Sequence, residues 1–417
     1  MTGAAILDQI RSGDFLDRAR IRRIAVIFLI VNLAAFIGLL VTSHDGVDMR
    51  GRPLGPDFFA FWSAGRIAGA GDAAGAYDFL TIVDFEREHF GGAAEHFAPF
   101  WSPPTFLMLI MPLSAPPFPL AWAAFSGLTF AAYFAAMRRL ASPSPLSILL
   151  IVSAPGVLLN ATHGQTGFLF AALFAALAAS IDRRPLVAGV LIGLLALKPQ
   201  YGLMIPLCLA VAGKWRVLAA AAAAVAASLA AATVAFGVSI WPAFLANNAL
   251  ARHVLLETGE VRWEKNASLY AALRNFGAAP SPAYVAQGLF AAAVAAALLA
   301  LWRSAADTRL KMAGLIVASI AITPYTLDYD LLILAPAIAL LASCALETGA
   351  RPYEKTALGL AWIAPVTMPA AMALKIPLGL LALVALFAVI LARARSSLAR
   401  SPAGDVDEAR CPTVLSR

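Results

Sequence analysis

The chain has 417 residues, of which 61% are hydrophobic and only 13% are charged. Water-soluble domains rarely combine so many apolar residues with so few charges, so the composition excludes a soluble enzyme and indicates a polytopic membrane protein. The formal charge of +7 comes from basic residues in short clusters between apolar runs. This distribution argues against a nucleic-acid partner and is typical of the basic loops that orient membrane proteins.

The N-terminal segment, residues 1–23, is rich in arginine, and an apolar run follows it from Ile24 to about Val41. This run is longer than the apolar core of a signal peptide, and no convincing small-residue cleavage site ends it. We therefore expect residues 1–23 to be cytoplasmic and the first span to stay attached to the protein.

The next segment, residues 43–103, is the longest polar stretch inside the membrane part. Acidic residues outnumber basic ones in it, which predicts an extracytoplasmic loop. Its apolar residues recur at roughly helical spacing between polar ones. This spacing predicts two short amphipathic helices lying on the outer leaflet.

One carboxylate in this loop, Asp57, stands among aromatic residues in the stretch from Gly55 to Trp62. Aromatic side chains favour the headgroup level of a bilayer, so Asp57 is expected at the membrane surface. There it could take a proton from a polar molecule while a lipid-borne molecule docks beside it. The alternative is that Asp57 only caps a short helix.

The remaining apolar runs, oriented by their flanking Lys and Arg clusters, predict one membrane-embedded domain at residues 24–392. The fold is expected to be all-α, with about twelve spans and both termini in the cytoplasm. A second large outer loop is expected at 238–282, and a disordered cytoplasmic tail at 393–417. Prolines divide the second predicted span into a short piece and a full crossing. The predicted spans lie near 24–42, 104–137, 144–160, 167–181, 185–197, 202–213, 217–237, 283–302, 312–323, 330–345, 356–370 and 376–392.

Several predicted spans, notably 185–197, 202–213 and 312–323, are too short to cross about 30 Å as straight helices. Their outer ends carry polar residues. Non-helical backbone at membrane depth is tolerated only where it is buried in protein or lines a wet cavity. The pattern therefore predicts a polar cavity that opens outward.

Two polar motifs at these outer ends supply candidate binding residues. The turn 160–166 contains His163 and Gln165, which either bind a substrate or belong to a solvated turn. The motif 197–202 places Lys198 and Gln200 at the end of an apolar helix. A lysine there either snorkels to the headgroups or meets an anion, and we favour the anion.

A third motif and the second outer loop add further candidates. Residues 323–330 contain two carboxylates and two phenols, among them Tyr325 and Asp328, although one carboxylate could simply cap the following helix. Arg262 and Lys265 lie in the 238–282 loop, which reads as a basic, aromatic lid. Such a lid suits a phosphate or a sugar, and it equally suits a surface facing lipid headgroups.

The order of these motifs resembles glycosyltransferase family 87 from about residue 24 to residue 390. The motifs are Pro-Asp-Phe-Phe-Ala-Phe-Trp, Phe-Trp-Ser-Pro-Pro-Thr-Phe, His-Gly-Gln-Thr-Gly, Leu-Lys-Pro-Gln and Thr-Pro-Tyr-Thr-Leu-Asp-Tyr-Asp. The resemblance implies a GT-C fold and transfer of mannose or another sugar from a polyprenyl phosphate. It also implies that Asp57 is the general base and that Gly164, Gln165, Lys198 and Pro199 are landmarks. Asp328 and Asp330 depart from the pattern expected at their position.

The expected partners are a polyprenyl-phosphate-sugar donor, a lipid or glycan acceptor and membrane lipids, in a multi-pass protein of the plasma (inner) membrane. Lys198, followed by His163 and Arg262 or Lys265, is expected to stabilise the departing phosphate. The first loop has no paired Asp motif, so we predict that no metal or other cofactor is needed. A transporter or flippase of lipid-linked sugars is the alternative. Transporters often have two related halves, and the sequence shows no internal repeat, which favours the enzyme.

Overall fold

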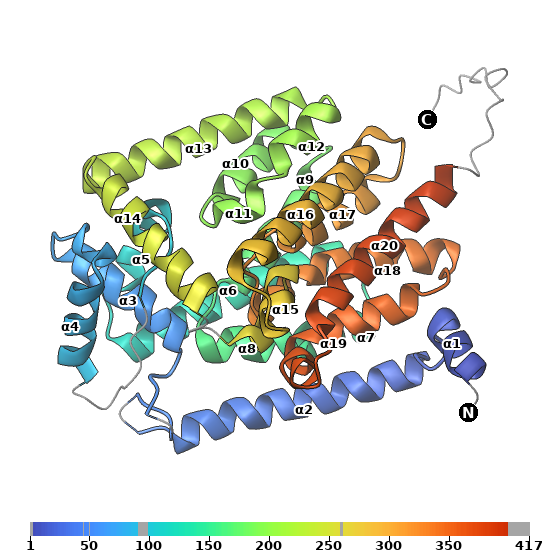
Figure 1. Cartoon of the computed structure of the whole chain (residues 1–417), viewed down its shortest axis with the longest axis horizontal. Coiled ribbons are helices and arrows are strands. Elements are labelled where there is room, and N and C mark those ends of the chain that lie inside the picture. The colour runs from blue at the N-terminus through green and yellow to red at the C-terminus, as the bar shows by residue number, and fades with distance from the viewer. Residues whose placement is uncertain (1–2, 45, 50, 91–98, 259–261, 399–417) are drawn as a thin grey trace, which may run out of the picture.

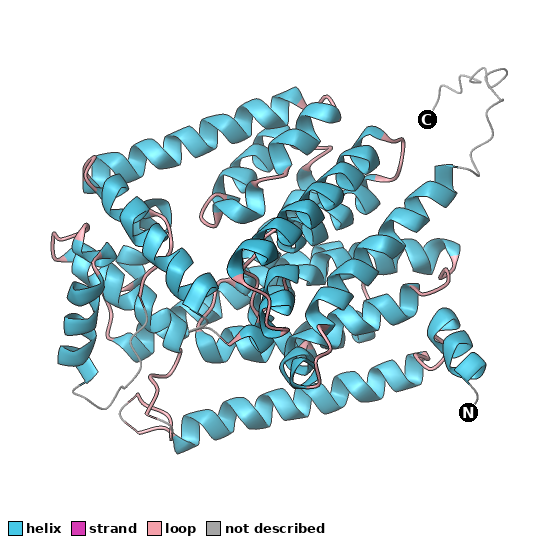
Figure 2. Cartoon of the chain, viewed as in Figure 1, coloured by secondary structure: helices cyan, strands magenta, loops and turns pink. Residues whose placement is uncertain are grey.

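The computed structural model describes residues 3–44, 46–49, 51–90, 99–258 and 262–398. Every regular element in these ranges is a helix, and Figure 2 shows no strand among them. The predicted all-helical fold is therefore confirmed for this part of the chain. The tail beyond residue 398, the loop residues Asp45, Arg50 and Glu95, and residues 259–261 of the second loop lie outside the described residues.

Seven helices in the described part of the chain are long and apolar enough to cross a membrane. An eighth crossing results if α7 (Pro145–Ser153) and α8 (Pro155–His163), which meet at a 42° bend, count as one span. The seven are α2 (Arg18–Thr42), α6 (Phe118–Leu140), α13 (Trp215–Phe236), α16 (Pro280–Arg303), α18 (Ala335–Thr348) with the preceding η4 (Asp328–Leu334), α19 (Glu354–Ala373) and α20 (Leu378–Leu398).

Each of the twelve predicted spans contains helix, but several of these helices are short. The short ones are α5 (Pro104–Leu113), α9 (Gly167–Ser180), α10 (Pro185–Leu195), α11 (Pro199–Gly202), α12 (Ile205–Val211) and α17 (Thr308–Ala321). The count of twelve crossings therefore stays a prediction. The division of 104–137 is confirmed, since α5 ends at Leu113 and α6 begins at Phe118.

The bend between α7 and α8 has a local cause at Pro155. Proline has no N–H, so the carbonyl of Ile151 loses its helical donor, and the Tyr133 hydroxyl donates to it instead at 3.2 Å. The Asn32 amide of α2 donates to the carbonyl of Ser153 at 3.1 Å. Side chains of neighbouring helices thus satisfy the opened backbone, as a broken helix in a membrane requires.

Helices form where the two short loop helices are predicted, and the first of them is covered by other helices; their position on the outer leaflet stays a prediction. Helix α3 (Pro56–Gly69) packs against α5 and α6, and Phe58, Phe59, Phe61 and Trp62 are all buried in the main apolar core. An aromatic run suits a buried helix as well as a membrane surface, and here neighbouring helices cover it. Helix α4 (Phe79–Phe90) is the more amphipathic, with Ile82 and Val83 inside and Leu80 exposed.

The helices at the C-terminal end are joined by a buried ion pair. The Arg393 guanidinium of α20 donates to Glu354 of α19 at 2.6 Å, and the two side chains are 3% and 1% exposed. Arg393 also donates to the carbonyls of Cys344 and Gly349. Residues 393–398 therefore continue α20, and the prediction that the disordered tail begins at 393 is wrong.

Glycines bring α10 and α13 into close contact, and the small residues of α13 make this possible. A Cβ added at Gly193 would stand 2.5 Å from the Cβ of Ala224, and Gly189 lies equally tightly against Ala220. The Ala-rich run of α13 is thus a close-packing face, as expected from small residues in membrane helices.

We expect Gly193→Leu to destabilise the protein by about 1 to 3 kcal/mol because the added side chain forces α10 away from α13. Thermal unfolding of the purified protein in detergent measures the loss. Gly127→Leu in α6 is the matched control, since no atom lies within 4 Å of the position its Cβ would take. Equal destabilisation by both changes would contradict the close contact.

Candidate active site

Asp57 lies in the first turn of α3, after Gly55 and Pro56. Gly55 is the N-cap residue, with φ of +64°, and Pro56 suits a first helical position because it needs no N–H partner. Asp57 is therefore not the cap of the helix. Its Oδ2 is buried and has no hydrogen-bond partner among the described residues. A buried carboxylate oxygen without a partner is costly unless a ligand or water meets it.

The indole of Trp122 packs against the start of α3 at Gly55 and against the turn at Gly164. A Cβ at Gly55 would stand 2.6 Å from the indole, and one at Gly164 would stand 2.9 Å from it. Both glycines have positive φ, so a side chain is disfavoured at each for a second reason. The Trp122 indole nitrogen donates to the carbonyl of Ala161 at 3.2 Å. Trp122 thereby holds the segment before Asp57 against the turn that follows His163.

The turn between α8 and α9 is built from buried contacts rather than solvated. Asn160 is buried, accepts a hydrogen bond from the Gly167 amide at 2.8 Å and donates to the Tyr329 carbonyl at 2.9 Å. Gln165 donates to the Tyr329 hydroxyl at 3.2 Å. His163 Nδ1 donates to the Leu159 carbonyl at 2.9 Å, which leaves Nε2 for a ligand.

Two phenols from the segment that precedes and begins η4 lie close enough to Asp57 to feel its charge. The negative charge of Asp57 acts on both Tyr325 and Tyr329, and the ring of Tyr329 lies 5.8 Å from that of His163. Burial raises the pKa of the Tyr325 phenol, and the charges of Asp57, Asp330 and Asp328 raise it further. Tyr325 therefore stays protonated and can donate a hydrogen bond.

The two carboxylates of this segment have different partners. Asp330 accepts from the Leu327 amide at 3.1 Å, so it is the capping carboxylate. Asp328 is buried and accepts from the Tyr329 amide at 2.9 Å. The positive groups that act on Asp328 are Lys265 and His163. Lys265 and His163 are thus close enough to Asp328 for their charges to act on it.

Lys198 has a protein partner instead of a free ammonium. Its Nζ lies 3.2 Å from Asp330 Oδ1, and the two side chains are 16% and 4% exposed. The ammonium also lies within 6 Å of the ring centres of Phe170 and Tyr201, at 5.7 and 5.6 Å. Lys198 therefore does not snorkel, and a phosphate would have to compete with Asp330 for it.

Backbone contacts join the 238–282 loop to the η4 segment. Asn266 and Leu327 form an antiparallel bridge, and the Ala267 amide donates to the Thr326 carbonyl at 2.8 Å. These backbone contacts bring Lys265, at the end of η3 (Trp263–Lys265), near Asp328. The rest of the loop forms α14 (Ile240–Arg252), the π-helical turn η2 (His253–Thr258) and α15 (Leu269–Asn275).

Not every predicted binding residue joins the cluster. Arg262 is exposed and pairs with Glu264 at 2.7 Å, and Gln200 is exposed on α11. In the described part of the chain no recorded contact links either residue to the cluster. The structure thus brings together Asp57, His163, Gln165, Lys265, Tyr325 and Asp328. Lys198 joins this group through its ion pair with Asp330.

Three residues of this arrangement were missed at the sequence level. Tyr329 had no assigned role in its motif, Asp330 was considered only as one of two carboxylates that could cap the following helix, and Trp122 had no local signal beyond being aromatic. Among the described residues there is no group of three or more His, Cys, Asp or Glu side chains that could hold a metal ion. The prediction of metal independence is not tested by that finding.

The family model described as Glycosyltransferase family 87 matches residues 100–324, more than half of the chain. The chain belongs to glycosyltransferase family 87. No curated protein and no solved structure matches it. As a family 87 member it is a glycosyltransferase, and its apolar helices indicate a membrane protein.

The family 87 match covers only part of the cluster. It includes His163, Gln165, Lys198 and Lys265, while Asp57, Tyr325 and Asp328 lie outside it. The assignment of a role to Asp57 therefore depends on the geometry of this chain.

Proposed function

We propose that this family 87 protein transfers a sugar, such as mannose, from a polyprenyl phosphate to a lipid or glycan acceptor. Asp57 is the general base. The observation that carries the proposal is Asp57 Oδ2, which is buried and has no hydrogen-bond partner among the described residues. Two phenols lie close enough for the charge of Asp57 to act on them, and two basic groups act on the neighbouring Asp328. Such a set offers a base for an acceptor and positive groups for a leaving phosphate.

The reaction needs one base and no covalent intermediate. The acceptor hydroxyl loses its proton to Asp57 as its oxygen bonds to the anomeric carbon of the sugar. The bond between that carbon and the phosphate oxygen breaks, and the polyprenyl phosphate departs with the electron pair. Lys265 and His163 stabilise the negative charge of this leaving group, and Tyr325 donates a hydrogen bond to the sugar or the phosphate.

The extracytoplasmic site follows from the proposed orientation of α2. Figure 1 places α1 (Gly3–Ser12) and α3 at opposite ends of this 25-residue helix. Arginines cluster at its start, and the positive-inside rule assigns that end to the cytoplasm. Asp57 then faces the outside of a plasma (inner) membrane.

The proposed activity is tested with purified protein, a polyprenyl phosphate carrying a radiolabelled sugar, and extracted membrane lipids and glycans as acceptors. We expect label to move to an acceptor and free polyprenyl phosphate to appear in equal amount. A transporter or flippase would leave the label on its original carrier. Family membership favours transfer over that alternative.

Lys198→Ala is expected to lower thermal stability, because it leaves the buried Asp330 carboxylate without its cation. The double change Lys198→Ala with Asp330→Asn removes the charge as well, so we expect it to regain stability and near-normal donor affinity. Apparent donor affinity at saturating acceptor is the measurement. If the stable double variant still binds the donor roughly tenfold to a hundredfold more weakly, Lys198 contacts the donor phosphate directly.

A further inference from the structure

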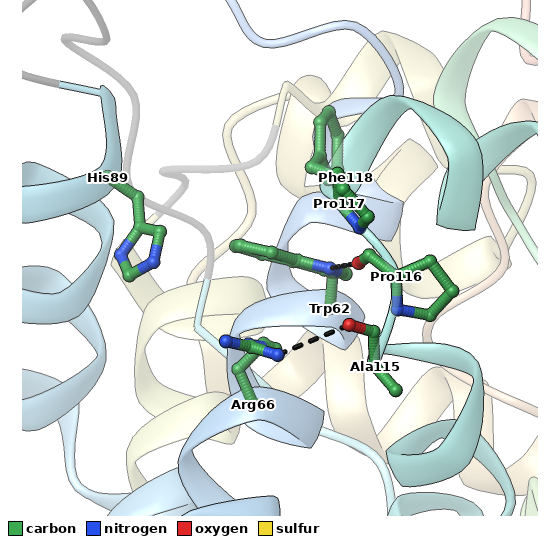
Figure 3. A pocket seen from close by; sticks show the side chains of 7 residues that line it. All are labelled: Trp62, Arg66, His89, Ala115, Pro116, Pro117 and Phe118. Atoms are coloured by element: carbon green, nitrogen blue, oxygen red, sulfur yellow. Dashed lines mark hydrogen bonds between the residues drawn. The ribbon is translucent and has the colours of Figure 1, made fainter.

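A cavity of about 350 Å³ lies between α3, α4 and the connection from α5 to α6. Figure 3 shows the side chains that line it, which are Trp62, Arg66, His89, Ala115, Pro116, Pro117 and Phe118. Arg66 follows Asp57 by nine residues on the same helix. At 1.5 Å per residue the two positions are about 14 Å apart, so this cavity is separate from the proposed reaction site.

Arg66 brings a positive charge to this cavity that has no carboxylate partner within the described part of the chain. Its Nη1 donates to the Ala115 carbonyl at 3.3 Å, and its guanidinium carbon lies 5.8 Å from the centre of the Trp62 ring. No ion pair to Arg66 occurs among the residues that the structure describes. One carbonyl uses only one of its five N–H donors, so the others are available to an anion.

His89 approaches the same indole from α4. Its Nδ1 donates to the Phe85 carbonyl at 3.0 Å, which leaves Nε2 for a ligand. Its ring lies 5.3 Å from Trp62, edge to face, and stacks on Phe85 at 4.1 Å. Trp62 itself is satisfied, because its indole nitrogen donates to the Pro116 carbonyl at 3.0 Å. The two basic side chains are thus held against one aromatic ring, as Figure 3 shows.

The place of the cavity points to a lipid as the source of the anion. Phe118, in its wall, is the first residue of α6, which is long and apolar enough to cross a membrane. The end of such a span lies at the headgroup level, where Trp side chains are favoured and where Arg side chains near helix ends can reach. Pro117 and Phe118 add an apolar wall beside the basic groups, which suits the start of a lipid chain.

We propose that this cavity binds the phosphate of a membrane lipid, with Arg66 as the main contact and His89 as the second. Arginine is well suited to this task because its planar fork donates two hydrogen bonds to one phosphate. Lipid binding at this cavity does not require catalysis at Asp57, so this proposal is independent of the proposed transferase reaction.

The test uses the full-length protein in a neutral detergent and native mass spectrometry, with phosphatidylglycerol and phosphatidylcholine as probes. We expect tighter binding of phosphatidylglycerol to the wild type, because its phosphate carries an uncompensated negative charge. Arg66→Ala should weaken that binding roughly tenfold to a hundredfold, and Arg66→Lys should weaken it less. Arg52→Ala, at an exposed arginine of the same loop outside the cavity, is the matched control.

Equal binding of both lipids by the wild type would overturn the proposal. An equal loss in the Arg66→Ala and Arg52→Ala variants would also overturn it, since the effect would then be general surface charge. Methyl phosphate is the soluble competitor. If it binds in an Arg66-dependent way while the two lipids do not differ, the ligand is a soluble phosphate and the lipid assignment is wrong.

Discussion

Asp57→Asn is expected to reduce sugar transfer by about a hundredfold to ten-thousandfold, the usual contribution of a general base. The Asn side chain has nearly the volume of the Asp carboxylate, but at neutral pH it cannot take the proton from the hydroxyl of the acceptor substrate. Because Gly55 and not Asp57 caps α3, the helix should still form. Initial rates of label transfer at saturating donor and acceptor measure the change, and donor affinity should stay within a few fold.

Asp84→Asn is the matched control for this prediction. Asp84 is an exposed carboxylate of the same loop, on α4, and its loose contact with Arg87 at 3.9 Å contributes little. We expect wild-type rates from this variant. Transfer by the Asp57→Asn variant within a few fold of wild type would exclude Asp57 as the base and direct attention to Asp328.

Arg393→Leu is expected to cost about 3 to 5 kcal/mol of stability, because it leaves the buried Glu354 carboxylate without its partner. The change also removes the donors that satisfy the carbonyls of Cys344 and Gly349. Thermal unfolding in detergent measures the loss. The site residues lie elsewhere in the fold, so the fraction that remains folded should keep its specific activity.

Two further variants separate a buried ion pair from a general loss of charge. Glu354→Leu together with Arg393→Leu removes both charges and should recover part of the stability. Arg309→Leu breaks the partly exposed pairs with Glu347 and Asp307, whose side chains are 56% and 40% exposed, and should cost no more than about 1 kcal/mol for each pair. A similar loss from Arg309→Leu and Arg393→Leu would contradict the role given to burial.

The parts of the fold that depend on local chemistry could be predicted from the sequence. Proline cannot donate the helical hydrogen bond, so the prolines between Leu113 and Phe118 predicted the break between α5 and α6. The burial of α3 was not, because its aromatic run is equally compatible with a membrane surface until the covering helices are known. Residue 393 was likewise expected to begin a tail, since nothing in its neighbourhood indicates a buried partner.

The sequence allowed several residues of the candidate site to be named, but it did not allow the contacts of these residues to be predicted. Asp57, His163, Gln165 and Asp328 could be named because polar residues at the ends of apolar helices are unusual. The pairing of Lys198 with Asp330 joins residues 132 positions apart, and no local pattern reports such a contact. The same applies to Trp122, whose place between two glycines depends on three separate segments.

The amide of Asn32 has a consequence for how the first helix is placed during assembly. Only Ala25 and Asn32 of α2 are buried, so apolar contacts allow this helix to slide along its neighbours. A slip of one turn, about 5.4 Å, would take the amide away from the carbonyls of Ser153 and Ala154 and leave it unpaired in lipid. The hydrogen bonds of Asn32 therefore fix the position of α2 along its axis relative to α7 and α8. That position determines where α2 ends and where the segment that carries Asp57 begins.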